Sequence, residues 1–169
     1  PLDSMKTTMA GAVDFVTVDP FSSTSLSQRL AEIAAEEALE QSGIGSKGDF
    51  PGPLFLAVAP IETEWPQRLE VARDVPTKDF GIIEYLATCS GGKFAHFHRR
   101  FTFGSVALSL AETFGTKGSP ISLSTACASG ATAIQLGVEA IRRGETDATL
   151  CIATDGSVNP EAMVRFSLL

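Results

Sequence analysis

The chain has 169 residues, of which 44% are hydrophobic and 20% are charged, and its formal net charge is −7. These values are typical of a globular domain with its own core, and the acidic balance argues against general nucleic-acid binding, which needs a basic surface. No apolar stretch reaches the ~18 residues of a membrane-spanning helix and the first residues do not resemble a signal peptide, so we expect a cytoplasmic protein that binds no membrane.

A first helix is predicted over residues 26–41. Ser25 and Gln28 have the spacing of a capping box, and Gly43 is placed as a C-cap glycine. The apolar residues recur with the period of a helix, and we expect them to form its buried stripe: Leu26, Leu30, Ile33, Ala34 and Ala38. The preceding residues, 1–24, are rich in Gly, Pro, Ser and Thr and predict an irregular segment with one weak strand.

Short apolar runs predict three strands, of which the first has the pattern of a strand buried on both faces and the third is also expected to be buried. These runs are residues 54–59, 121–124 and 148–153. Between the first two runs, the sequence predicts a surface excursion with helical turns over 61–86 and a helix of small residues over 104–114. A helix from Cys127 to about Arg143 follows the second run, and residues 120–154 are long enough for a parallel crossover. This alternation predicts an α/β layer fold.

Cys127 is placed where the second predicted strand passes into this helix. A thiol reacts as its thiolate, and the free amides of a helix N-terminus favour negative charge. We expect Cys127 at or within the first helical turn, where the same amides can also hold an oxyanion. Small neighbours leave room for a substrate chain: Ala126, Ala128, Ser129 and Gly130. The alternative is a small buried residue in a tight turn, since cysteine is often buried.

The other cysteines and the two histidines are weaker candidates. Cys151 lies inside an apolar run and is expected in the core. Cys89 lies near His96 and His98, which leaves open a Cys/His hydrolase, although we expect both histidines in loops or on the surface. Three cysteines without paired spacing indicate reduced thiols, and neither a disulfide framework nor a zinc site is predicted.

The segment around Cys127 carries a family resemblance. It reads S-T-A-C-A-S-G-A-T-A-I-Q-L-G-V-E-A-I-R-R-G-E-T-D over residues 124–147. This resembles the nucleophile region of the β-ketoacyl-acyl-carrier-protein synthases, in which Thr-Ala-Cys-Ala-Ser/Thr-Gly precedes an Ala-Ile pair and Ile-Arg-x-Gly-x-x-Asp. Residues 27–44 resemble the family's early helix, and Gly118-Ser119-Pro120 its approach to the nucleophile strand.

The resemblance implies a thiolase-like fold, with residues 1–169 as a partial N-terminal half whose mixed or parallel sheet is covered by helices. It also implies a 3-oxoacyl-[acyl-carrier-protein] synthase of the type II elongating class, active in fatty acid or polyketide synthesis. Cys127 would accept an acyl chain, and its amide would help to hold the thioester oxygen. Decarboxylative condensation with a malonyl carrier protein would follow. The implied partners are an acyl carrier protein and a second copy of the chain, without metal or organic cofactor.

Two departures limit what the resemblance implies. The family's two catalytic histidines lie beyond the cysteine, whereas this sequence has none there. We therefore expect a fragment that does not condense by itself, or alternatively a non-catalytic homologue that pairs with a catalytic chain. After the third strand, Thr154-Asp155-Gly156 replaces the family's usual Gly-Gly pair and acidic residue, which leaves acyl length open.

Basic residues are scarce, and their clusters bear on how an acidic carrier protein would dock. Lys93, Arg99 and Arg100 form the densest cluster. Solvated surface charge and a docking surface are both compatible with their spacing, so no docking residue is assigned. Arg142 and Arg143 are better explained as the basic end of the helix that follows Cys127.

Overall fold

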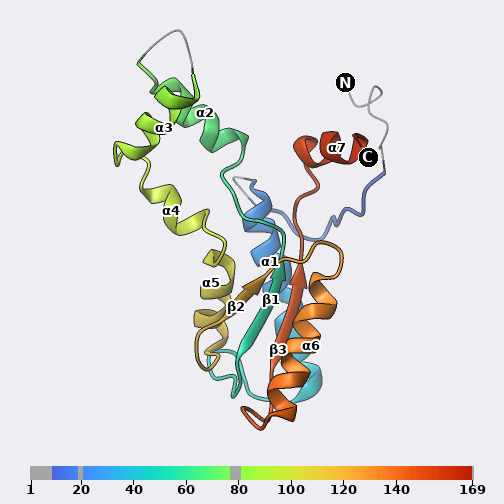
Figure 1. The fold of residues 1–169 in the computed structure, drawn as a ribbon. Helices are drawn as coiled ribbons and strands as arrows, with labels where there is room; N and C mark the ends of the chain where they lie inside the picture. Colours follow the sequence, from blue (N-terminus) through green and yellow to red (C-terminus); the bar gives the residue numbers. More distant parts are fainter. Residues whose placement is uncertain (1–8, 19–20, 77–80, 169) are drawn as a thin grey trace.

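The computed structural model describes residues 9–18, 21–76 and 81–168. At its centre is a sheet of three parallel strands, β1 (Leu54–Val58), β2 (Ile121–Leu123) and β3 (Leu150–Thr154). The strand order is β2-β1-β3, so the first strand is central (Figure 1). The three predicted apolar runs are thus confirmed as strands. Burial on both faces is confirmed for β1, whereas only Leu150 and Ile152 of β3 are buried and Ile121 of the edge strand β2 is exposed. The predicted α/β class and parallel sheet are confirmed.

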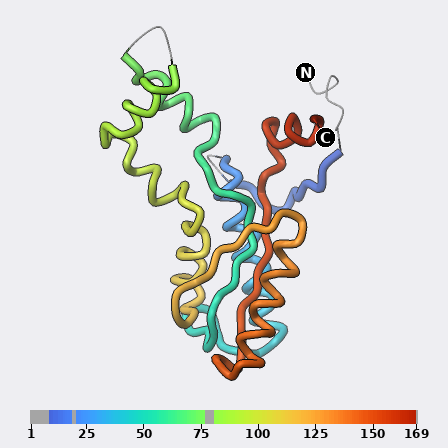
Figure 2. Tube along the Cα trace, viewed as in Figure 1, coloured from blue at the N-terminus to red at the C-terminus, as the bar shows by residue number. Residues whose placement is uncertain are grey.

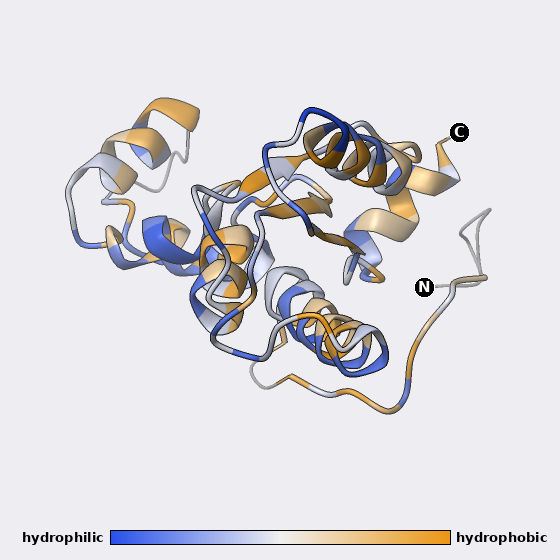
Figure 3. Cartoon of the chain, turned by 90° about the horizontal axis from the view of Figure 1, so that it is seen from below, coloured by the Kyte–Doolittle hydropathy of each residue, from blue (hydrophilic) through white to orange (hydrophobic). Residues whose placement is uncertain are grey.

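Helices cover both faces of the sheet (Figure 3). On one face, α1 (Ser23–Ser42) and α5 (Ser105–Phe114) pack on alternate residues of β1 and β3. Phe114, Leu110 and Val106 of α5 are fully buried in this larger core. On the other face, α6 (Ser129–Arg142) packs through Ala133 and Ala140 against Phe55 and Ala57 of β1. The sheet is therefore the middle of three layers.

The predicted start of α1 is wrong by three residues. The helix begins at Ser23, because Ser22 is the N-cap and its side-chain oxygen accepts a 2.9 Å hydrogen bond from the Ser25 amide. Ser25 and Gln28 are therefore inside the helix and form no capping box. Gly43 is confirmed as the C-cap: its φ is 64°, and its amide donates to the Leu39 carbonyl.

The predicted buried stripe of α1 is also wrong. The apolar residues buried against the sheet and α5 are Ala31, Ala35 and Leu39. Of the predicted stripe, Leu26, Leu30 and Ile33 are half-buried, and Ala34 and Ala38 are exposed. The small side chains of Ala31 and Ala35 allow the axis of α1 to approach the sheet. Leu26 and Leu30 instead line a cavity together with residues of the segment 11–18. That segment is irregular, so the weak strand predicted there is wrong.

Three helices between β1 and α5 extend away from the sheet (Figure 2). They are α2 (Trp65–Arg73), α3 (Ile82–Ser90) and α4 (His96–Arg100). The predicted helical turns are confirmed, although α3 continues through Cys89. No helix in the described ranges is long and apolar enough to cross a bilayer.

Four charged side chains form ion pairs that join the last helix, α7 (Pro160–Ser167), to α2 and to the loop that precedes α2. Arg68 forms ion pairs of 3.2 and 3.4 Å with Glu62 and Glu161. Arg165 binds the same two carboxylates at 3.0 and 2.6 Å. This network brings α7 to the end of the sheet at which β1 and β3 terminate.

Candidate active site

Cys127 is carried by the turn between β2 and α6, although not at the predicted position. The helix begins at Ser129 with Ala128 as its N-cap, so Cys127 lies just before the helix and outside its first turn. Ala126 has a φ of 51°, in the left-handed region that non-glycine residues rarely adopt. This conformation turns the chain sharply after the strand and delays the start of the helix.

Hydrogen bonds within the turn hold this conformation. The amide of Thr125 donates to the Ser129 side-chain oxygen at 2.7 Å, and that hydroxyl donates to the Ala126 carbonyl at 2.6 Å. The amides of Ala128 and Ser129 donate to the carbonyls of Thr125 and Ala126 at 3.2 and 3.1 Å. These two amides are therefore occupied inside the turn and are not available to an incoming oxyanion.

Cys127 is exposed and lines a cavity of about 520 Å³. The cavity lies where β1 and β3 end, and its walls include Ala59, Pro60, Thr154, Asp155 and Phe166. Ligands of open α/β sheets bind at the carboxyl ends of the strands. The alternative prediction of a buried structural thiol is therefore wrong for Cys127, and the position suits a nucleophile open to substrate.

The chain after β3 approaches α1 closely beside this cavity. Thr154 donates its hydroxyl to the Ser27 carbonyl at 2.7 Å, and the Gly156 amide donates to the Ser27 side chain at 2.8 Å. A Cβ atom at Gly156 would lie 2.7 Å from the Ser23 carbonyl oxygen. Asp155 accepts from the Ser157 amide at 2.8 Å. Thr154 and Asp155, which line the cavity, are therefore held by hydrogen bonds of their own segment to α1 and to Ser157.

The two histidines do not contribute to this site. His96 and His98 lie on α4, both are exposed, and neither is among the residues that line the cavity. The prediction of surface roles for them is confirmed. Within the described chain, no group of three or more His, Cys, Asp or Glu residues is arranged to hold a metal ion.

The other two thiols have structural surroundings. Cys151 lies within β3, and its thiol donates to the Ala133 carbonyl of α6 at 3.4 Å. It is half-buried in the smaller core, close to the predicted role. Cys89 is half-buried on α3 and hydrogen bonds with Tyr85. Burial, and secondarily this thiol, raise the pKa of Tyr85.

The predicted basic cluster does not gather at the Cys127 cavity. Lys93 pairs with Asp74 of the α2 end, and Arg100 hydrogen bonds to α1. Neither Lys93, Arg99 nor Arg100 lines that cavity. Arg142 is in the last turn of α6, as expected of a basic helix end.

Comparison with known proteins matches the second half of the chain to one family. Residues 95–169, which include Cys127 and its turn, match the family model described as beta-ketoacyl synthase, N-terminal domain. This part of the chain belongs to the β-ketoacyl synthase family. It is 36% identical over 74 residues to a putative polyketide beta-ketoacyl synthase 1 of Streptomyces halstedii, covering 44% of this chain and 18% of that protein.

A longer match extends the similarity from the β-ketoacyl synthase part over most of the chain. It is 30% identical over 163 residues to the pikromycin polyketide synthase component PikAII of Streptomyces venezuelae, covering 91% of the chain and 4% of that protein. It is 42% identical over 65 residues to the spectinabilin polyketide synthase system protein NorA' of Streptomyces orinoci, covering 38% of the chain and 2% of that protein. The chain thus spans less than a fifth of these relatives.

Proposed function

We propose that this chain supplies the acyl-accepting cysteine of a β-ketoacyl synthase that builds polyketides. The observation that carries the proposal is the exposed Cys127 on the wall of a cavity of about 520 Å³, within the part that matches the family. The named relatives are polyketide synthases, which favours polyketide synthesis over the fatty acid synthesis that the resemblance put first.

The first step is acyl transfer. The Cys127 thiolate attacks the carbonyl carbon of an acyl thioester, and the carbonyl electrons move onto oxygen. When the oxyanion collapses, the bond to the carrier sulfur breaks and the carrier thiolate leaves and takes up a proton. Because the amides of Ala128 and Ser129 are used within the turn, we assign the oxyanion to the amide of Cys127 itself.

The second step is condensation. A malonyl thioester loses CO₂, the resulting carbanion attacks the Cys127 thioester, and the new carbon–carbon bond displaces the thiolate. The enolate that forms needs hydrogen-bond donors. His96 and His98 are the two histidines of the sequence and neither lines the cavity, so we propose that these donors come from elsewhere. The role proposed for these 169 residues is acyl loading.

The proposed partners follow from this chemistry. Both thioesters would be delivered on the phosphopantetheine arm of an acyl carrier protein, a separate protein in the type II class. A second copy of the chain would complete a homodimer, in the cytoplasm. Co-elution with an acyl carrier protein and the mass of the assembly in solution test these proposals separately from the chemistry.

Labelling of the three cysteines tests the proposed role directly. The protein is incubated with an acyl thioester of N-acetylcysteamine, and adducts are located by intact-mass and peptide mass spectrometry. We expect one acyl group on Cys127 and none on the Cys127→Ala variant. Cys89→Ala and Cys151→Ala are matched controls, because each removes a half-buried thiol away from the cavity mouth. They should be acylated as the parent is.

Two results would contradict the proposal. Equal acylation of the parent and the Cys127→Ala variant would show that Cys127 is not the acceptor. Absence of any adduct on a protein with a normal circular dichroism spectrum would favour the alternative of a non-catalytic homologue.

A further inference from the structure

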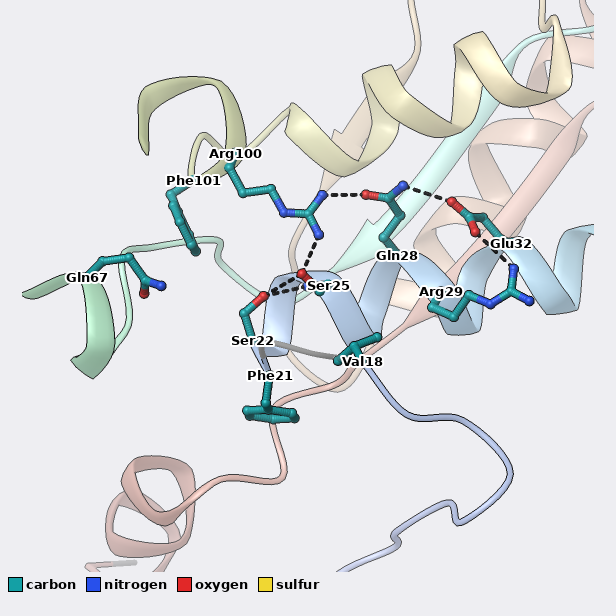
Figure 4. A pocket seen from close by; sticks show the side chains of 10 residues that line it. All are labelled: Val18, Phe21, Ser22, Ser25, Gln28, Arg29, Glu32, Gln67, Arg100 and Phe101. Atoms are coloured by element: carbon teal, nitrogen blue, oxygen red, sulfur yellow. Dashed lines mark hydrogen bonds and ion pairs between the residues drawn. The ribbon is translucent and has the colours of Figure 1, made fainter. Parts of the chain in front are cut away.

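A second cavity, of about 490 Å³, lies between α1, α2 and α4. It shares no lining residue with the Cys127 cavity. Figure 4 shows its polar side: Arg100 at the end of α4 reaches across to Ser25 and Gln28 of α1. Phe101 and Phe21 supply apolar walls. The proposed condensation chemistry leaves this cavity without a role.

The Arg100 guanidinium is held by neutral acceptors alone. Nη1 donates to Gln28 Oε1 at 2.7 Å, and Nη2 donates to Ser25 Oγ at 2.5 Å. In the described part of the chain, Arg100 forms no ion pair. A guanidinium carries five N–H donors, so three remain for another acceptor. A half-buried cation with no counter-charge attracts an anion more strongly than an exposed one does.

The acceptors that hold Arg100 are fixed in turn. Gln28 Nε2 donates to Glu32 at 2.8 Å and to Ser109 of α5 at 2.9 Å, which orients its oxygen toward Arg100. The Glu32 carboxylate also pairs with Arg29 at 3.2 Å. Glu32 is the one carboxylate among the described residues that line the cavity, and it is already paired with Arg29. The positive charge of Arg100 is therefore not neutralised within the described part of the cavity wall.

We propose that this cavity binds the phosphate group of a small organic phosphate ester. The planar donor fork of arginine binds phosphate oxygens in pairs. Gln67, whose carbonyl oxygen already accepts from the Glu64 amide, offers its side-chain NH₂ on the same cavity wall. A phosphate group takes only part of a cavity of about 490 Å³, and the two phenylalanines give the organic part an apolar contact.

The test uses inorganic phosphate, phenyl phosphate and acetate as probes, at constant ionic strength, in isothermal titration calorimetry. We expect saturable binding of both phosphates, tighter for phenyl phosphate because its ring contacts the apolar walls, and weaker binding of acetate. Arg100→Gln should weaken phosphate binding by about tenfold or more, because it removes the positive charge and its charge-assisted hydrogen bonds to the phosphate oxygens.

Arg99→Gln is the matched control, because it removes the same charge from the adjacent residue of α4, which does not line the cavity. Its phosphate affinity should equal that of the parent. Ser25→Asp keeps the test valid if Arg100→Gln fails to fold. It places a carboxylate beside Arg100 at the third residue of α1, where an acidic side chain favours the helix. We expect this variant to lose phosphate binding while keeping its melting temperature.

Three results would overturn the proposal. These are an absence of saturable phosphate binding to the parent, equal affinities of the Arg99→Gln and Arg100→Gln variants, and acetate binding as tight as that of phosphate. Equal affinities for phenyl phosphate and inorganic phosphate would overturn the assignment to an organic ester.

Discussion

The backbone amide of Thr125 donates a 2.7 Å hydrogen bond to the side-chain oxygen of Ser129, across the turn that presents Cys127. The same hydroxyl donates to the carbonyl of Ala126, the residue with the left-handed backbone. Ser129 is thus bonded to both sides of the turn, and it positions Cys127 without touching the reacting atoms.

Ser129→Ala should therefore loosen the turn. We expect a loss of about 1 kcal/mol in the free energy of unfolding for the missing hydrogen bonds, and a slower rate of Cys127 acylation in the mass-spectrometric assay. Ser90→Ala is the matched control, since Ser90 donates a comparable 2.8 Å bond to the Ala87 carbonyl on α3. An acylation rate of Ser129→Ala equal to that of the parent would show that the turn is held by other contacts.

Glu64 caps a helix that lies far from it in sequence. Its Oε1 accepts from the amide of Ser23 at 2.7 Å and from that of Thr24 at 3.4 Å, at the start of α1. Glu64→Ala should lower the free energy of unfolding by about 1–2 kcal/mol, because it leaves helix-start amides without an acceptor. Urea denaturation measures the change.

Two further variants separate this capping effect from charge. Glu64→Gln keeps an acceptor oxygen and should recover part of the lost stability. Glu40→Ala removes an exposed carboxylate near the other end of α1, where negative charge opposes the helix dipole, and should not destabilise the protein. Equal losses in Glu64→Ala and Glu40→Ala would rule out the capping role.

Gly137 allows α6 to contact β3 closely. A Cβ atom at this position would lie 2.5 Å from Cys151 Sγ and 2.7 Å from Thr149 Oγ1. Gly137→Ala should destabilise the protein by about 1–3 kcal/mol in thermal or urea denaturation, the usual cost of overpacking. Adding Cys151→Ala should recover part of the loss. Stabilisation by Gly137→Ala, as the helix propensity of alanine favours, would show that the helix shifts without strain.

Arg143 and Glu145 form a bidentate ion pair just beyond α6. Arg143 Nε donates to Glu145 at 2.7 Å and Nη2 donates to it at 3.1 Å. This hydrogen bonding lowers the pKa of Glu145. Because the folded-state pKa is the lower one, any stability from the pair is present above the unfolded pKa and is lost as the pH falls through the folded pKa.

Carboxyl chemical shifts followed by NMR across acidic pH measure this effect. Arg143→Gln should raise the pKa of Glu145 toward its ordinary value. Arg142→Gln removes the same charge one residue earlier and should leave the Glu145 titration unchanged. A Glu145 titration that is the same in the parent and in Arg143→Gln would contradict the pairing. Since both side chains are exposed, the change in overall stability should be small.

The central strand, Leu54–Val58, was predictable because its residues are apolar without interruption, a pattern that burial on both faces requires. The stop of α1 at Gly43 was predictable because a left-handed C-cap favours glycine for its backbone alone. In both cases the determining physics is local.

The buried face of α1 was not predictable, since the helix has two apolar faces and tertiary packing chooses between them. Ala31 and Ala35 are buried, whereas Leu26 and Leu30 are only half-buried, because the helix lies close to the sheet. The exact place of Cys127 before α6 depends on the side-chain bonds of Ser129. The contact of Arg100 with Ser25 joins residues 75 positions apart, which no local pattern encodes.

The central place of β1 has a consequence for synthesis. Its partners are β2 and β3, and both are encoded later than the strand itself. Between the emergence of Val58 and that of Ile121 from the ribosome, the five apolar residues of β1 are outside without either neighbouring strand. Such unpaired strand edges attract other chains. Until α5 is made, α1 is the one helix of the larger core available to shield β1, so a nascent chain without α1 should depend more on chaperones.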